Sequence, residues 1–204
     1  MKIDEFEKVR NLNYDQYCDY LRSKYGIGLC DYFTSSWKKN PKVTRTKDGL
    51  FAHHVAEDKM VMLSEVKIAK LCPMEWQSKE NLVYCDYLEH LFLHYLICKF
   101  PNPNKVPNAD VGIGGVIAFL VPKLNDMYSG FPIKQNWEIN CFNKVKDDLD
   151  VYLEIIKDFI SWIKIAKPEM SVKCLFTSFN EQFKLWSAKN NVAVFEKILN
   201  IWEA

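Results

Sequence analysis

The fold of this chain is decided by residues 81–99, which read NLVYCDYLEHLFLHYLICK. The short apolar run Leu82-Val83-Tyr84 predicts a strand. Asp86 and Glu89 follow at the spacing of an acidic capping box, which marks the start of a helix. Apolar residues then recur every three or four positions up to Lys99, and prolines at 101 and 103 end the pattern. This stretch therefore predicts a strand that leads directly into a helix.

Outward from this stretch, most of the chain has helical periodicity. Helices are expected at residues 4–25 with a break near 11–13, and at 111–128, 143–166 and 179–202. Ser178 is the candidate cap of the last helix. A short apolar run at 50–55 predicts a second strand, with 59–63 as its expected hairpin partner. We therefore expect an α+β fold that is mostly α-helical.

The composition is that of a globular protein without a charge bias. Of its 204 residues, 49% are hydrophobic, and 27 Lys and Arg balance 26 Asp and Glu. The overall charge therefore gives no argument for nucleic acid or membrane as a partner. Seven cysteines without a C-x-x-C pair argue against a disulfide framework and a zinc ribbon. No signal-peptide pattern or bilayer-length apolar tract is visible, so we expect a cytoplasmic protein with no membrane partner.

All four histidines lie between positions 53 and 94. His90 and His94 are four residues apart on the predicted helix, so their rings project from one face and can hold one divalent cation. His53 and His54 are neighbours on a predicted strand and point to opposite faces. One of this pair can supply a third metal ligand, which would leave positions open for water and substrate. The pattern therefore predicts a three-histidine metal centre with one histidine outside it, and the spacing leaves open which of the pair is the ligand.

The order His53-His54, Asn81-Leu82-Val83 and His90-x-x-x-His94 resembles the motif of the HNH (ββα-metal) endonucleases. The likeness covers residues 48–99, and it departs from many members in lacking bracing cysteines and in having a long interstrand segment, 56–80. It implies a central ββα-metal finger flanked by N- and C-terminal helices. The implied division is N-terminal helices and a basic loop at 1–47, the nuclease core at 48–100, and a C-terminal helical region packed on the core at 101–204.

The resemblance also assigns roles to single residues. His53, His90 and His94 would ligate one divalent metal ion. His54 would be the general base that activates water, and Asn81 would pin the loop that keeps this base oriented. The implied activity is metal-dependent hydrolysis of phosphodiester bonds in DNA. Mg²⁺, Mn²⁺, Zn²⁺ and Ni²⁺ all stay open, because imidazole favours the last three whereas family members often use Mg²⁺.

Other interpretations of the same residues remain open. One is a structural zinc site, with Cys85 as a fourth ligand beside the three predicted histidines. A second is a non-catalytic nucleic-acid- or protein-binding module that keeps the metal-braced ββα element. A third is a ribonuclease or toxin-like nuclease with the same site. Glu57 and Asp58 are expected in a solvated turn, and the alternative is that they orient the ligating histidines.

A run of cations precedes the motif. Residues 38–47 hold five of them and no acid, namely Lys38, Lys39, Lys42, Arg45 and Lys47. The candidate nucleic-acid contacts are Lys42, Arg45 and Lys47, since cations bind backbone phosphates without sequence preference. A solvated loop is an equal alternative. DNA is thus the expected partner, RNA is possible, and the C-terminal helices could form a homodimer or bind another protein.

Overall fold

The computed structural model describes residues 1–176 and 192–204. The described part is an α+β structure, mostly helical, with one two-stranded sheet. The α-helices are α1 (Ile3–Val9), α2 (Tyr14–Tyr25), α3 (Val66–Ala69), α4 (Tyr87–Lys99), α5 (Val121–Tyr128), α6 (Asn136–Asn143), α7 (Leu149–Ala166) and α8 (Val192–Glu203). Short helical turns are η1 (Pro41–Val43), η2 (Thr46–Asp48), η3 (Val55–Asp58), η4 (Met74–Gln77), η5 (Lys79–Asn81), η6 (Gly115–Leu120) and η7 (Val172–Leu175).

The two strands confirm the strand predictions but not the predicted hairpin. β1 (Phe51–His54) pairs antiparallel with β2 (Leu82–Cys85), so that His53 lies opposite Val83 and His54 opposite Leu82. The prediction that residues 59–63 pair with β1 is wrong. The turn η3 follows β1 at once, and Met62 has a φ of 58°, which interrupts extended backbone. The partner strand therefore lies beyond the whole interstrand segment.

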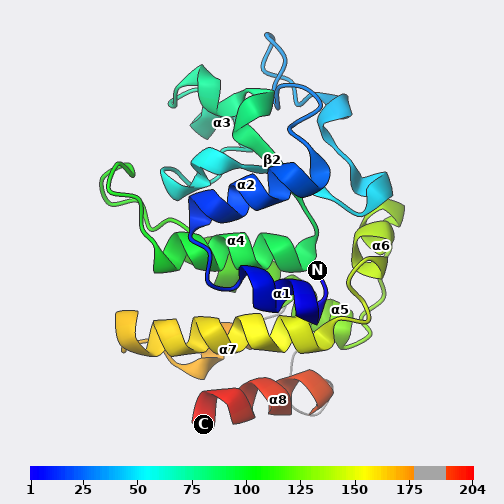
Figure 1. The fold of residues 1–204 in the computed structure, drawn as a ribbon, viewed down its shortest axis with the longest axis vertical. Helices are drawn as coiled ribbons and strands as arrows, with labels where there is room; N and C mark the ends of the chain where they lie inside the picture. Colours follow the sequence, from blue (N-terminus) through cyan, green and yellow to red (C-terminus); the bar gives the residue numbers. More distant parts are fainter. Residues whose placement is uncertain (177–191) are drawn as a thin grey trace.

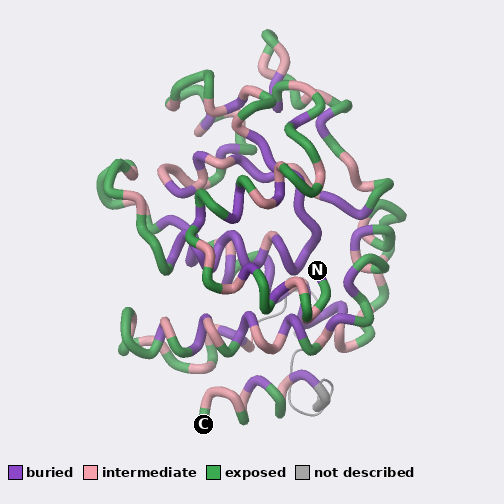
Figure 2. Tube along the Cα trace, viewed as in Figure 1, coloured by how far each residue is buried: buried purple, intermediate pink, exposed green. Residues whose placement is uncertain are grey.

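Helix α4 is the centre of the fold. Its predicted capping box is present: Asp86 accepts a hydrogen bond from the Glu89 backbone N–H at 2.8 Å, and Glu89 accepts one from the Asp86 N–H at 2.7 Å. Eleven of its thirteen residues are buried. Figure 2 shows this buried backbone running through the middle of the molecule. A helix that is apolar nearly all round needs cover on every side, and the other elements provide it.

The surrounding elements form layers around α4. In Figure 1, the sheet and α2 lie on one side of α4, and α7 followed by α8 lies on the other. One hydrophobic cluster joins these layers, with Leu21, Val83, Phe92, Phe159 and Ile198 among its fully buried members. In the described part of the chain, no helix is both long and apolar enough to cross a bilayer.

The remaining helix predictions have mixed outcomes. The two helices within 4–25 and the helical run ending at 128 are confirmed. The helix expected at 143–166 begins only at Leu149, because residues 144–147 form turns, and α6 was not predicted. Ser178 and the predicted helix start at 179 lie outside the described residues, whereas α8 covers the end of that prediction.

Candidate metal centre

Strand β1, turn η3 and helix α4 bring four side chains together. His53 comes from β1, Glu57 from η3, and His90 and His94 from successive turns of α4. Each offers one nitrogen or oxygen, and these four atoms all lie within 4.8 Å of one another. The three histidines are those that the sequence predicted as ligands, and the structure brings them together. Together with Glu57 they form a cluster that could hold a metal ion, and these four residues are named the metal centre.

The spacing of the four donor atoms suits a single ion. The Nε2 atoms of His90 and His94 are 3.2 Å apart. Oε2 of Glu57 lies 3.4 Å from Nε2 of His94 and 3.7 Å from Nδ1 of His53. Ligands of a tetrahedral ion with bonds of about 2.0–2.1 Å are separated by about 3.3–3.4 Å. In addition, the buried Nδ1 of His53 has no hydrogen-bond partner among the residues that the structure describes, so a cation would satisfy an otherwise unpaired atom.

The electrostatics of the metal centre also favour a cation. Burial lowers the pKa of His53 to about 3 and lowers those of His90 and His94 as well. Burial opposes the charge of Glu57, but the surrounding imidazoles hold the pKa of its carboxyl below the usual range. At neutral pH the site therefore holds uncharged rings, each with one lone pair, beside one carboxylate. A buried negative charge of this kind is stabilised by a bound cation.

Close packing against the start of η6 holds His94 in place. A Cβ at Gly115 would lie 2.3 Å from Nδ1 of His94, so only glycine lets this segment approach the ring. Gly112 approaches α4 in the same way, since a Cβ there would lie 2.9 Å from the carbonyl oxygen of His94. Gly112 and Gly115 therefore let this segment pack directly against α4.

His54 lies outside the metal centre. Its ring is 1% exposed and lies 4.4 Å from the ring of Tyr32, centroid to centroid. Nε2 of His54 is 2.9 Å from Oε1 of Gln77, whose amide N–H donates to the Leu63 carbonyl at 3.3 Å. The amide oxygen of Gln77 thus accepts from the Nε2–H of His54. The other nitrogen, Nδ1, then carries a lone pair and lies 3.7 Å from Oε1 of Glu57.

Asn81 ties together the segment that leads into β2. Its side-chain N–H₂ donates to the carbonyl of Glu75 at 2.8 Å and to the hydroxyl of Ser78 at 3.3 Å. Gln77, the partner of His54, lies between these two contacts in the chain. Asn81 therefore holds the backbone that carries the Gln77 amide, and it touches His54 only through that residue.

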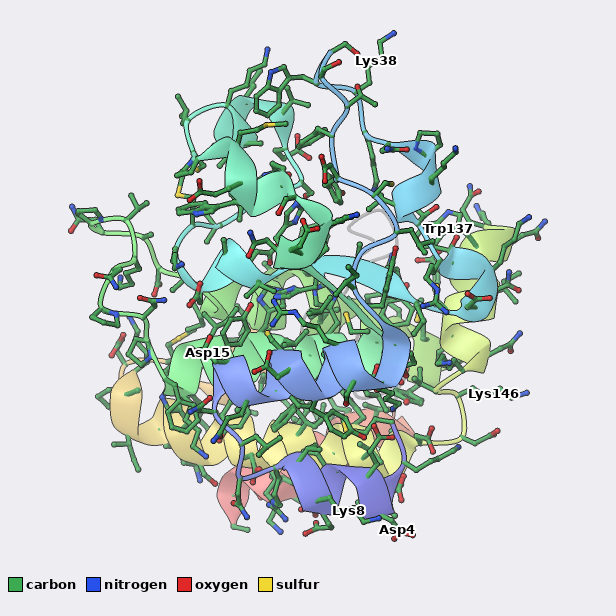
Figure 3. All side chains as sticks on the ribbon, turned by 45° about the horizontal axis from the view of Figure 1, so that its top comes forward. Asp4, Lys8, Asp15, Lys38, Trp137 and Lys146 are labelled. Atoms are coloured by element: carbon green, nitrogen blue, oxygen red, sulfur yellow. The ribbon has the colours of Figure 1, made fainter. Side chains whose placement is uncertain are left out.

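The predicted phosphate-binding cations differ in their surroundings. Lys42 and Lys47 are exposed, and Figure 3 shows Lys38 at the tip of its loop, pointing away from the molecule. Arg45 is instead engaged internally. Its guanidinium donates to the Tyr25 carbonyl at 2.9 Å and to Asp48 at 3.0 Å.

Glu57 was not assigned as a metal ligand from the sequence, although a place beside the ligating histidines was the alternative to a solvated turn. Its expected place in a solvated turn is wrong, because its side chain is only 16% exposed and faces the histidines. Asp58, 6% exposed, accepts a hydrogen bond from Asn102 and is not in a solvated turn either. The i, i+4 spacing of His53 and Glu57 was the available signal. Cys85 is not among the four clustered donors, and its thiol contacts the Phe51 carbonyl at 3.9 Å.

Comparison of the chain with protein-family models, curated proteins and solved structures found no match.

Replacing a clustered histidine should reduce the metal content of the protein, whereas replacing His54 should not. We expect wild-type protein loaded with Zn²⁺ or Ni²⁺ to retain about one equivalent after dialysis, since three imidazoles and a carboxylate suit these ions. His90→Ala and His94→Ala should each lose most of it, as measured by mass spectrometry of the metal. His54→Ala is the matched control and should retain the metal. Equal losses in His54→Ala and His94→Ala would contradict this assignment.

Two adjacent glycines offer a second test. Gly115→Ala should weaken Zn²⁺ binding by about tenfold, because the new Cβ displaces the ring of His94. Gly114→Ala is the control, because a Cβ there meets nothing within 4 Å and the residue is helical, with φ −61° and ψ −39°. Affinities measured by competition with a chromophoric chelator should differ between the two variants. Matching affinities would show that the contact with Gly115 does not hold His94.

Proposed function

We propose that this protein is a metal-dependent endonuclease of the HNH type that hydrolyses phosphodiester bonds in DNA. The observation that carries the proposal is the convergence of His53 with His90 and His94, from a strand, strand, helix succession. Three imidazoles and one nearby carboxylate are a donor set that fits Zn²⁺, Ni²⁺ or Mn²⁺ better than Mg²⁺. A divalent ion held there would polarise the phosphodiester and stabilise the charge on the leaving oxygen.

In this proposal His54 accepts the proton of the attacking water. Two contacts support the role: the Nε2–H of His54 is held by Gln77, and the basic Nδ1 faces Glu57 at 3.7 Å. His54 is 1% exposed, so it reaches the metal centre through the Glu57 carboxylate. Glu57 spans the gap, with one oxygen towards His54 and the other 3.4 Å from His94. Water at the centre would pass its proton to Glu57, and Glu57 to His54.

In the same proposal Asn81 maintains the orientation of His54 indirectly. It fixes the backbone on both sides of Gln77 through its contacts with Glu75 and Ser78. Gln77 in turn holds Nε2 of His54, so that Nδ1 stays directed towards Glu57. Outer partners of this kind position a reactive ring without touching the substrate.

The nucleic acid would be held by charges near the motif. Lys42 and Lys47 are exposed and available for backbone phosphates. The guanidinium of Arg45 is held by Tyr25 and Asp48, so Arg45 contributes less to phosphate binding than its sequence position suggests. The net charge of +1 favours local contacts over a general attraction to DNA. The same site chemistry suits RNA, so RNA belongs in the assay.

The second candidate function is a non-catalytic binding module braced by the metal. The observation that favours it is Glu57, because a fourth protein donor closes the coordination shell of a tetrahedral ion, as in structural sites. The deep burial of His53 and His94 also suits such a brace. The two candidates differ in whether Glu57 carries protons or only ligates.

A plasmid-cleavage assay with metal add-back tests the leading proposal. Wild-type protein should nick or cut DNA, and His54→Ala should lower turnover by about 10²–10⁴-fold, the usual contribution of a general base. Its metal content should stay unchanged, since His54 is not in the metal centre. If wild-type protein holds metal yet cuts neither DNA nor RNA, the nuclease proposal is refuted and the binding module is favoured.

Asn81→Ala should reduce turnover more than metal affinity. We expect about a tenfold loss of cleavage rate, because the backbone around Gln77 loses its tie and His54 its fixed orientation. Ser78→Ala is the control, since it removes only the weaker 3.3 Å contact and leaves the one to Glu75. Rates and metal content should be measured on the same preparations. If Asn81→Ala lost its metal altogether, the orienting role would be wrong.

A further inference from the structure

A tyrosine far from the motif contacts the metal centre. Tyr14 is the first residue of α2 and is 3% exposed. Its hydroxyl lies 2.9 Å from Nε2 of His53, 39 residues along the chain. The capping box of α2, formed by Asn13 and Gln16, fixes the helix turn that carries this phenol. Tyr14 is therefore placed rigidly behind the ring of His53.

The hydrogen bonds around this hydroxyl determine where its proton lies. The Tyr14 oxygen is also 2.9 Å from the carbonyl oxygen of Val55 and 3.5 Å from that of His54. Carbonyl oxygens only accept, and a phenol has a single proton to donate. The proton of Tyr14 is thus directed at Val55, so the contact with His53 needs a proton on the imidazole. The Nε2–H of His53 donates to the phenol oxygen.

This arrangement decides which nitrogen of His53 is free. A neutral imidazole carries one proton, so a ring with Nε2–H has its lone pair on Nδ1. Nδ1 of His53 is the atom that faces Glu57 at 3.7 Å, and within the described part of the chain it has no hydrogen-bond partner. The tautomer imposed by Tyr14 is therefore the one that a metal at this site requires.

We propose that Tyr14 is a positioning residue of the metal centre, which fixes the Nε2–H tautomer of His53 and directs Nδ1 towards the ion. The inference rests on the metal centre of the proposed function and does not depend on DNA cleavage. It extends the site to α2, which the sequence motif does not include. Hydrogen bonds to the far nitrogen of a ligating histidine orient the ring and strengthen it as a ligand.

The test is Tyr14→Phe, which keeps the ring and removes the hydroxyl. Its affinity for Zn²⁺, measured by competition with a chromophoric chelator, should fall about 10–100-fold. Nitrogen-15 chemical shifts of His53 in the metal-free protein give a readout that a packing role would not move. The wild type should show protonated Nε2, and the variant should show a mixture of both tautomers.

The matched control is Tyr17→Phe, on the same face of α2. Tyr17 is fully buried, and its hydroxyl contacts the sulfur of Met1 at 3.9 Å and no histidine. It should keep the wild-type Zn²⁺ affinity and the wild-type tautomer of His53. An affinity of Tyr14→Phe within twofold of wild type, or a wild-type His53 protonated at Nδ1, would overturn the proposal. A protein that binds Zn²⁺ in this Tyr14-dependent way but cuts no nucleic acid would refute the nuclease alone.

Discussion

The antiparallel register between β1 and β2 is the constraint on which the metal centre depends. β2 leads through Asp86 directly into α4. The ring of His53, which lies opposite Val83, is therefore placed against the first turns of that helix. Successive strand residues face opposite sides, and a slip of one residue would exchange His53 and His54. All four β2 residues are fully buried, and Ile27 bridges Val83 from the other edge. This packing holds the register and thereby determines which of the two histidines faces α4.

The segment between the strands completes the site. It supplies Glu57 to the metal centre and Gln77 to His54, and Asn81 ties its end. Buried polar atoms are normally hydrogen-bonded. Nε2 of each of the two neighbouring histidines has a protein partner, Gln77 for His54 and Tyr14 for His53, and each Nδ1 lies 3.7 Å from an oxygen of Glu57. Among the described residues the buried Nδ1 of His53 has no hydrogen-bond partner, and this ring, unlike that of His54, belongs to the cluster that could hold a metal ion.

Local patterns were predictable because their physics is local. The capping box of Asp86 and Glu89 acts within one helical turn, so the start of α4 could be located from residue types alone. The spacing of His90 and His94 fixed their common face in the same way. The hairpin prediction at 59–63 failed because apolar residues there suggested a strand, whereas pairing is decided by residues more than twenty positions away. Helix α6 was also not predicted from the sequence, and the start of α7 was placed at residue 143 instead of Leu149.

By itself, the sequence determined a mostly helical α+β chain, a capped helix with two histidines on one face, and a strand with two more. Only the tertiary structure decided that β1 pairs with β2, that Glu57 turns inwards, and that Tyr14 lies behind His53. The physical reason is that helix caps and side-chain periodicity depend on neighbours along the chain. Burial, register and hydrogen-bond direction depend on which distant segments fill the space around a residue.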